Sequence, residues 1–391
     1  MIYFPSIDAA ASGMCLHNET KFLDRFGFSP KFWESWPDGY LHKYYLISAG
    51  VRYKNLDYVK KFNFPDDMEV FGDSGGYQIV SGVLTWNETL RHSIFNWLEH
   101  NSTIAANLDL PPRGKMEGKF DECLNISYEN FKYFYENQSG HTKYLNCLQG
   151  TNYYSYKEWY QRISGFEFSG WAIGAATWPE RYIGALALLL KNKEIQKKNC
   201  KYIHFFGVST IAEIMIFNYI ERLFRDNGLD VTITIDSSSP SLASSFGYWY
   251  VGYETNPERF KYIHIPRFKD NATIYSGRHQ IVPISNRVDE MMFTKASLFD
   301  VYKDYSGIDY AAIAFHNLSV FLDAMRSIND LMNSEMYTIE QIASKNVVNV
   351  IKSFEKIFHA PDPEREYLKH LNFYRTIKLP KPEFSGTQDF F

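Results

Sequence analysis

The stretch Phe71-Gly72-Asp73-Ser74-Gly75-Gly76-Tyr77-Gln78 joins an apolar run, which begins at Met68, to a carboxylate and two glycines. Glycine has no side chain and tolerates unusual backbone dihedral angles, so it lets the backbone approach a flat ligand closely. A second β-branched run, Val231-Thr232-Ile233-Thr234-Ile235, ends on another carboxylate, Asp236. Two strands that each end on an aspartate predict paired carboxylate chemistry on one parallel sheet.

Short β-rich runs alternate with amphipathic stretches along the whole chain. This alternation indicates parallel strands joined by right-handed helical crossovers. About eight such units predict an α/β fold of the (β/α)8 or TIM-barrel type, with an open doubly wound sheet as the alternative. The expected strands are Tyr44–Ser48, Met68–Gly72, Thr103–Leu108, Lys143–Leu148, Trp171–Gly174, Tyr202–Val208, Val231–Ile235 and Tyr310–Phe315.

Polar side chains follow many of these runs directly. In a barrel all carboxyl ends of the strands face one mouth, so residues at these positions converge there. The polar residues at predicted strand ends are Asp73, Asp109, Gln149, Asp236 and His316.

The seventh and eighth predicted strands are about 75 residues apart, which is longer than an ordinary connection and predicts a functional insertion. We therefore expect a barrel over residues 1–332 that includes an insertion at about 237–308. Helical spacing after the last predicted strand indicates a helical extension, and residues 333–391 are expected to pack on the barrel as a helix and tail.

Composition narrows the class of protein. The chain has 391 residues, 45% of them hydrophobic, and a net charge of −4, which argues against a broadly basic nucleic-acid coat. The four cysteines are scattered without a Cys-x-x-Cys pair, so neither a disulfide framework nor a cysteine-based zinc site is expected. No signal peptide or membrane-spanning run is expected, which predicts a cytoplasmic protein without membrane association.

Asp73-Ser74-Gly75-Gly76-Tyr77-Gln78 resembles the signature of the tRNA-guanine transglycosylase family. Further segments are similar to the family's motifs in the same order over roughly residues 70–330. They are Leu148-Gln149-Gly150, Gly170-Trp171-Ala172-Ile173-Gly174-Ala175, Phe206-Gly207-Val208, Ile235-Asp236 and Phe315-His316-Asn317-Leu318.

The resemblance implies exchange of guanine in a polynucleotide for a free 7-deazaguanine base. Asp236 would be the nucleophile at the sugar C1′, and Asp73 the general acid and base. Asp109 and Gln149 would read the purine edge, and Tyr77 and Phe206 would sandwich the base. The remaining base-binding positions implied by the resemblance are Ser74, Gly174, Ala175 and Gly207.

Two departures from the family pattern change the expected substrate. The cysteine cluster that would bind a structural zinc with a histidine at position 316 is absent, so no metal or other cofactor is expected, and His316 is interpreted as a core or mouth histidine. The basic stretch that usually follows the nucleophile is replaced by Ser239-Pro240-Ser241-Leu242-Ala243-Ser244-Ser245. This pattern resembles the DpdA-type DNA-guanine transglycosylases, which are thought to insert preQ0-type bases into DNA.

Several alternatives stay open on the sequence alone. DNA is the expected partner, with phosphates contacted by Arg267, Lys269, Arg278 and Arg287 of the insertion. The alternatives are an enzyme acting on tRNA, a base-releasing N-glycosidase and a catalytically inactive binding subunit. The sequence is also compatible with a homodimer.

Overall fold

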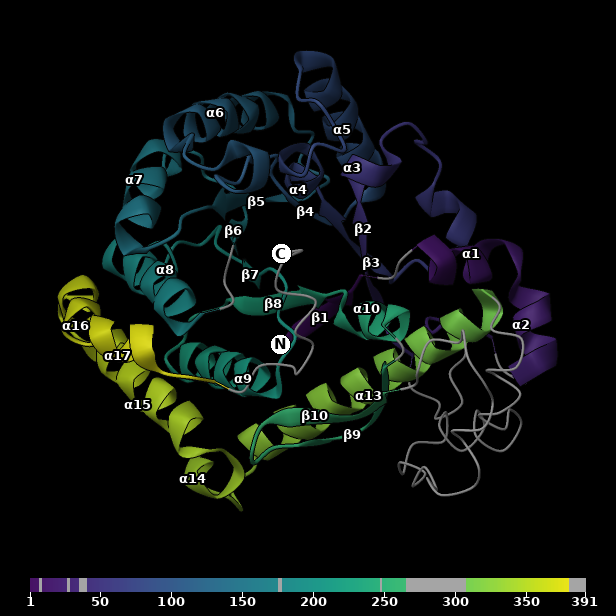
Figure 1. Ribbon diagram of the computed structural model, residues 1–391. Helices are drawn as coiled ribbons and strands as arrows, with labels where there is room; N and C mark the ends of the chain where they lie inside the picture. Colours follow the sequence, from purple (N-terminus) through teal and green to yellow (C-terminus); the bar gives the residue numbers. More distant parts are fainter. Residues whose placement is uncertain are drawn as a thin grey trace.

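The computed structural model describes residues 1–6, 9–26, 29–34, 41–174, 178–246, 248–264 and 307–379. Eight parallel strands form one sheet in the order β1-β8-β7-β6-β5-β4-β3-β2. A parallel bridge between Ser6 and Leu46 joins the two edge strands, so the sheet is nearly closed into a barrel. Helices surround the strands as an outer ring (Figure 1). The predicted α/β fold of the (β/α)8 type is confirmed.

Parallel pairing continues from strand to strand around the sheet. Each register aligns the carboxyl ends, as the pairs Ser48 with Asp73 and Phe4 with Asp236 illustrate. The strands are β1 (Ile2–Pro5), β2 (Tyr44–Ser48), β3 (Glu69–Asp73), β4 (Ile104–Ala106), β5 (Lys143–Leu148), β6 (Gly170–Ile173), β7 (Tyr202–Phe205) and β8 (Thr232–Ser237).

The predicted eighth strand is wrong. Tyr310–Phe315 lies inside the long helix α13 (Gly307–Asn333), and the missing strand of the barrel is β1 at the start of the chain. Residues Ala311 to Phe315 are all buried, so this part of α13 is apolar on every side and its sequence cannot be distinguished from a buried strand by periodicity. β1 is only four residues long and ends on Pro5, which weakened its strand signal.

This correction also moves the insertion. β8 is the last strand of the barrel, so the segment from 238 onward follows the barrel and does not interrupt it. Its described part contains α10 (Ser239–Ser245) and an antiparallel hairpin of β9 (Tyr248–Glu254) and β10 (Arg259–His264). α10 and β9 both pack on α13. The division of the chain at residue 332 stays a prediction.

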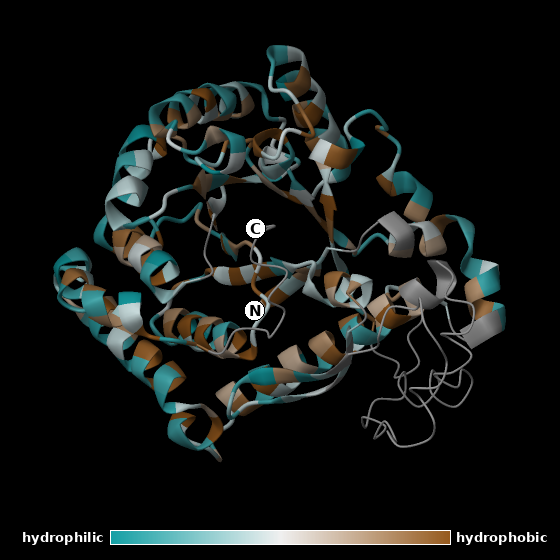
Figure 2. Cartoon of the chain, viewed as in Figure 1, coloured by the Kyte–Doolittle hydropathy of each residue, from teal (hydrophilic) through white to brown (hydrophobic). Residues whose placement is uncertain are grey.

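The barrel helices alternate with the strands, and the C-terminal helices cover α8 and α9 from outside (Figure 1). They are α1 (Ala9–His17), α2 (Glu19–Phe26), α3 (Ala49–Arg52), α4 (Gly76–Val80), α5 (Glu88–Asn101), α6 (Phe120–Asn137), α7 (Tyr153–Ile163), α8 (Pro179–Lys191) and α9 (Ile211–Asp226), then α14 (Ile339–Ile342), α15 (Lys345–His359), α16 (Pro363–Lys369) and α17 (Leu371–Thr376), with 3-10 turns η1 (Val59–Phe62) and η2 (Gly114–Met116). Hydrophobic residues run along α8, α9 and α13 (Figure 2), because these helices lie between the strands and an outer layer. None of the described helices is both long and apolar enough to cross a membrane.

The interior of the barrel is filled by side chains, as in other barrels of this size. Phe71 of β3 lies 5.4 Å from Phe4 of β1 and stacks on His204 of β7 at 4.1 Å between ring centroids. Because side chains alternate along a strand, Asp73 projects to the same side as Phe71, one step nearer the mouth. The apolar interior of the barrel therefore lies directly below the polar side chains at the carboxyl ends of the strands.

Buried polar side chains fasten α13 to the segment after β8. The His316 Nε2–H donates to the carbonyl of Tyr250 at 2.7 Å, so this histidine is a buried core residue as interpreted. Asn317 accepts from the Tyr250 amide at 2.8 Å and donates to the carbonyls of Pro240 and Tyr248 at 3.1 and 3.0 Å. Within the described residues no group of three or more His, Cys, Asp or Glu side chains is placed to hold a metal ion.

Candidate active site

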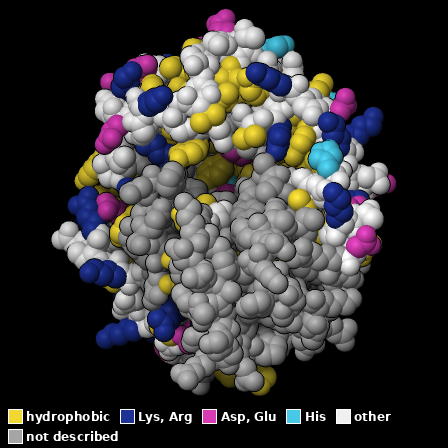
Figure 3. All heavy atoms as spheres, turned by 45° about the vertical axis from the view of Figure 1, so that its right-hand side comes forward, with side chains coloured by type: hydrophobic (Ala, Val, Ile, Leu, Met, Phe, Trp, Pro, Cys, Tyr) yellow, Lys and Arg dark blue, Asp and Glu magenta, His cyan; other side chains and the backbone are white. Residues whose placement is uncertain are grey.

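Asp73 and Asp236 lie at the carboxyl ends of β3 and β8, at the same mouth of the barrel. Burial is the main cause that raises the pKa of Asp73, and the charge of Asp236 at the same mouth adds to this shift. The face drawn in Figure 3 has a hollow near its centre in which hydrophobic and acidic side chains are visible. The structure therefore brings together two carboxylates that are 163 positions apart in the chain.

Asp236 is held by groups of β7 and the turn that follows it. The Gly207 amide donates to Asp236 Oδ1 at 2.9 Å. Gly207 has a φ of +73°, a left-handed conformation that favours glycine, so the residue type follows from the turn that aims this amide. An N–H donor on one oxygen stabilises the ionised carboxylate and fixes its orientation.

His204 lies directly beneath Asp236, and the sequence reasoning missed it. The ring is fully buried, with Nε2 at 3.4 Å from Asp236 Oδ1 and Nδ1 at 2.9 Å from the Thr234 hydroxyl. Phe206 packs edge-on against it at 4.6 Å between ring centroids and also lies edge-on to the stacked Phe71 at 6.3 Å. Its sequence signal was weak but present: His204 and Asp236 have the same inward phase on neighbouring strands.

Asp73 is enclosed at the end of β3 by polar neighbours. Burial raises its pKa above the ordinary value and the Asp236 charge adds to this, while the nearby Ser48 hydroxyl, the Gly75 amide and His204 oppose the shift. The Gly75 N–H lies 3.3 Å from Asp73 Oδ1. Gly75 has a φ of +89° and packs on Gly50. A Cβ added to Gly75 would come within 2.4 Å of the Gly50 Cα. The glycine at position 75 is therefore required by both dihedral angle and space.

Asp109 and Gln149 form a hydrogen-bonded pair at the mouth. Gln149 Nε2 donates to Asp109 Oδ2 at 2.6 Å, and both side chains are buried. Burial raises the pKa of Asp109 to about 6, with the Gln149 hydrogen bond opposing this and the charge of Asp73 adding to it. A Cβ on Gly174 would lie 2.2 Å from Gln149 Nε2, so Gly174 provides the space that Gln149 occupies. The Gly174 carbonyl accepts from the Tyr156 hydroxyl at 2.6 Å.

The other base-binding positions expected from the resemblance divide into two groups. Ser74 is buried and its hydroxyl donates to the Asn107 carbonyl at 3.0 Å, so it joins the ends of β3 and β4. Tyr77 is 38% exposed, with the Arg113 guanidinium 5.4 Å from its ring centroid, and Phe206 is half-buried against His204. Tyr77 therefore presents an accessible aromatic ring close to Asp109, with which Arg113 also interacts.

Five predicted residues lie outside the described residues. They are Ala175 of the proposed base site and the four basic residues of the insertion, Arg267, Lys269, Arg278 and Arg287. Their roles stay predictions.

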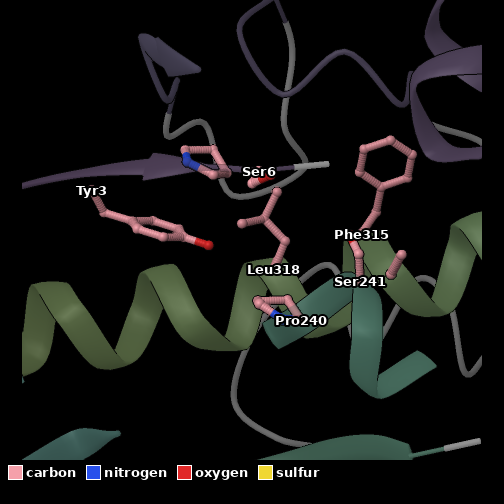
Figure 4. A pocket seen from close by; sticks show the side chains of 8 residues that line it. Tyr3, Ser6, Pro240, Ser241, Phe315 and Leu318 are labelled. Atoms are coloured by element: carbon pink, nitrogen blue, oxygen red, sulfur yellow. The ribbon is translucent and has the colours of Figure 1, made fainter. Parts of the chain in front are cut away.

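The segment after Asp236 packs against α13. A small pocket there is lined by residues that include Tyr3, Pro240, Ser241, Phe315 and Leu318 (Figure 4). The described residues that line it carry no charged side chain, and the Tyr3 hydroxyl donates to the Ser237 carbonyl at 2.9 Å. This pocket belongs to the packing of α10 on α13, whereas the paired carboxylates gather at the barrel mouth.

No protein-family model matches the chain, and no curated protein has a matching sequence.

Proposed function

We propose that the protein is a guanine transglycosylase that exchanges guanine in a polynucleotide for a 7-deazaguanine base through a covalent glycosyl intermediate on Asp236. The observation that carries the proposal is the position of Asp73 and Asp236 at the carboxyl ends of β3 and β8, at one barrel mouth, beside a hydrogen-bonded Asp109–Gln149 pair. Two carboxylates in different environments are what a retaining glycosyl transfer requires.

In the first step Asp236 attacks C1′ of the target nucleotide, and the bond between C1′ and guanine breaks. The Gly207 amide and His204 keep this carboxylate oriented toward the reacting carbon. Asp73, whose pKa is raised by burial, gives its proton to the departing guanine. In the second step Asp73 takes a proton from the entering base, which attacks C1′ and releases the Asp236 carboxylate. Two displacements retain the configuration at C1′.

Asp109 and Gln149 suit the Watson–Crick edge of guanine. An ionised carboxylate accepts from the ring N–H and exocyclic amine, and an amide N–H donates to O6. Because Gln149 already donates to Asp109, the two groups are held in position before a base arrives. The accessible ring of Tyr77 would stack on an extruded base.

DNA is the proposed polynucleotide. The segment that follows Asp236 contains no basic residue and forms α10, which packs on α13. The composition of this segment therefore does not support a role in recognising the polynucleotide. Other parts of the surface would have to contact the polynucleotide.

The test is incorporation of labelled guanine or labelled preQ0 into guanine-containing DNA and, in parallel, into tRNA. Asp236→Ala is expected to abolish incorporation and the covalent protein–polynucleotide adduct, and Asp73→Asn to reduce incorporation by roughly 100-fold or more. The matched control is Asp226→Asn, which should behave as wild type because Asp226 ends α9 just before β8 begins, at the face of the barrel opposite the mouth.

Four outcomes separate the alternatives. Label in DNA supports the proposal, and label in tRNA alone rejects the choice of DNA. Release of guanine without incorporation identifies a base-releasing N-glycosidase. Wild-type binding of DNA without adduct, release or incorporation identifies a binding subunit and rejects the catalytic proposal.

A further inference from the structure

Exposed aromatic side chains gather at the mouth of the barrel. In the part of the chain that the structure describes, five aromatic side chains are 38% exposed or more, namely Tyr77, Tyr135, Tyr154, Trp178 and Tyr337. Three of them stand where a barrel helix begins: Tyr77 and Tyr154 are the second residues of α4 and α7, and Trp178 is the N-cap of α8. Single exposed rings need no explanation, but three at one edge of the molecule indicate a binding surface.

The three rings border one arc of the mouth. Each comes four or five positions after a strand-end residue of the proposed base site: Asp73 with Tyr77, Gln149 with Tyr154 and Gly174 with Trp178. The strands that precede them belong to one run of neighbours in the sheet, β3-β4-β5-β6. The helices α4, α7 and α8 accordingly lie along one arc of the barrel (Figure 1). A polymer that enters the mouth across this arc therefore meets aromatic rings in successive sectors.

The loop after β4, between the sectors of Tyr77 and Tyr154, supplies cations to the same arc. The Arg113 guanidinium lies 5.4 Å from the centroid of the Tyr77 ring. Lys115 is exposed and lies along the turn after α4, because a Cβ on Gly82 would come within 2.5 Å of its Cε. Two side chains of α6 hydrogen-bond to the backbone of this loop and fix it. Around the hollow in Figure 3, basic side chains alternate with hydrophobic ones.

Tyr154 is exposed on a fixed backbone. Its side chain is 62% exposed, whereas its amide donates to the Asn152 side chain at 3.0 Å as part of the cap of α7. The ring lies edge-on to the buried Tyr153, at 5.9 Å between ring centroids. A ring on a fixed backbone loses little conformational freedom when a flat ligand stacks on it.

Trp178 is an unusual residue for its position. Residues that cap the start of an α-helix carry a short side chain with an oxygen acceptor, and a tryptophan has none. The Trp178 side chain accordingly makes no capping hydrogen bond, and Pro179 follows it at the first position of α8. The start of α8 therefore does not account for a large aromatic ring at this position.

We propose that Tyr154 and Trp178 continue the stacking surface of Tyr77, and that this aromatic rim binds single-stranded DNA next to the target guanine. Aromatic rings stack on bases of any sequence, and neighbouring cations bind the phosphates, which is the role of Arg113 and Lys115. Bases inside a duplex stack on one another, so they must be unpaired before they can use the rim. The inference rests on the proposed function in one respect: the bound strand is the one whose guanine enters the mouth.

The experiment uses oligothymidylate, which contains no guanine, so that the base site does not contribute. Its binding is measured by fluorescence anisotropy over a series of salt concentrations for wild type, Tyr154→Ala, Trp178→Ala and Lys115→Gln. The control is Tyr135→Ala. Tyr135 is 39% exposed in the last turn of α6, at the face of the barrel opposite the mouth, and packs on Phe168 just before β6.

Each aromatic variant is expected to bind oligothymidylate about 5- to 100-fold more weakly, with an unchanged salt slope, because the lost stacking involves no phosphate. Lys115→Gln should instead reduce the salt slope by about 0.7 for each phosphate that it no longer neutralises. Trp178→Phe keeps an aromatic ring and should recover most of the affinity that Trp178→Ala loses.

The inference is overturned if Tyr154→Ala and Trp178→Ala, shown to be folded by thermal melting, bind oligothymidylate like Tyr135→Ala. A wild-type preference for a duplex over its separated strand would overturn it as well. Tighter binding of oligouridylate than of oligothymidylate would assign the rim to RNA and reject DNA.

These readouts also separate the inference from the function. If wild type exchanges no base into any polynucleotide, the proposed function fails, yet oligothymidylate binding still tests the rim. If wild type exchanges bases while the aromatic variants bind oligothymidylate normally, the rim is rejected and the function stands.

Discussion

Nε2 of His204 lies 3.4 Å from Oδ1 of Asp236, beneath the proposed nucleophile and within the electrostatic reach of Asp73. The Thr234 hydroxyl can donate to Nδ1, which leaves the proton of a neutral ring on Nε2, facing the carboxylate. Such contacts are often long in the free enzyme and tighten when the substrate binds. The geometry assigns His204 the role of a positioning residue for Asp236.

Among the described residues Nε2 of His204 has no hydrogen-bond partner, and we predict that it gains one, the Asp236 carboxylate, when the substrate binds. Because a hydrogen bond to a charged group contributes roughly 1.5–3 kcal/mol, His204→Phe should lower kcat by about 10- to 100-fold with little change in KM. Phenylalanine keeps the stacking on Phe71, so the fold should persist. The steady-state rate of base incorporation measures the effect. Thr234→Val is the milder companion variant, and an unchanged kcat in both would show that His204 is only a packing residue.

The Asp109 carboxyl gives the site a pH dependence. Burial raises its pKa to about 6, so a growing fraction is protonated as the pH falls below that value. A protonated Asp109 cannot accept both guanine N–H groups. We therefore expect the affinity for free guanine to fall as the pH is lowered from 7 to 5, measured by calorimetry. Asp109→Asn should bind guanine weakly at every pH, and a pH-independent wild-type affinity would remove Asp109 from the base site.

The Asp109 carboxyl also makes the stability of the fold depend on pH, but its contribution to stability is lost as the pH rises, whereas the affinity for guanine is lost as the pH falls. Its pKa is higher in the folded chain than in the unfolded chain, so the folded state binds the proton more tightly. The resulting stabilisation is fully present below about pH 4, the ordinary pKa of an aspartate, and is lost as the pH rises through about 6. We predict that Asp109→Asn raises the free energy of unfolding at pH 7.5 by roughly 1–3 kcal/mol and has little effect at about pH 4. Denaturant melts at both pH values measure this, and a destabilised variant at the higher pH would contradict it.

Gly174 has a steric role that can be tested directly. A Cβ at this position would lie within 2.3 Å of three atoms of the Gln149 side chain, so Gly174→Ala must displace Gln149 from Asp109. We predict that the variant binds guanine about tenfold or more weakly, the cost of removing one hydrogen bond to a charged group. Calorimetric titration with guanine measures it. Gly165→Ala is the matched control, because a Cβ there meets nothing within 4 Å.

The sequence predicted the barrel and much of the mouth because one physical rule governs both. Parallel strands end at the same edge, so a carboxylate after an apolar run, as at Asp73 and Asp236, is delivered to that edge wherever the run lies in the chain. The same rule could not find β1, which is too short, and it mistook the buried part of α13 for a strand. Periodicity carries no information where every side of an element is buried.

One site feature depends on tertiary contacts and gave only a weak sequence signal. A buried histidine in an apolar run is usually a core residue, and His204 differs only because Asp236 of the next strand lies above it.

Polar contacts of Asn317 hold α13 to the segment after β8. Asn317 is fully buried and makes three hydrogen bonds, which join α13 to the backbone of α10 and β9. Asn317→Ala leaves one amide and two carbonyls without their partner, which should lower the free energy of unfolding by roughly 2–4 kcal/mol.

Because α10 begins two residues after β8, which carries Asp236, the Asn317→Ala variant should also become inactive at temperatures below its melting point. Urea unfolding and the temperature dependence of base incorporation measure the two effects. Asn137→Ala is the control, since Asn137 is exposed at the end of α6, where its side chain donates to the carbonyl of Tyr133. Equal stability of the two variants would show that the Asn317 hydrogen bonds do not stabilise the attachment of α13.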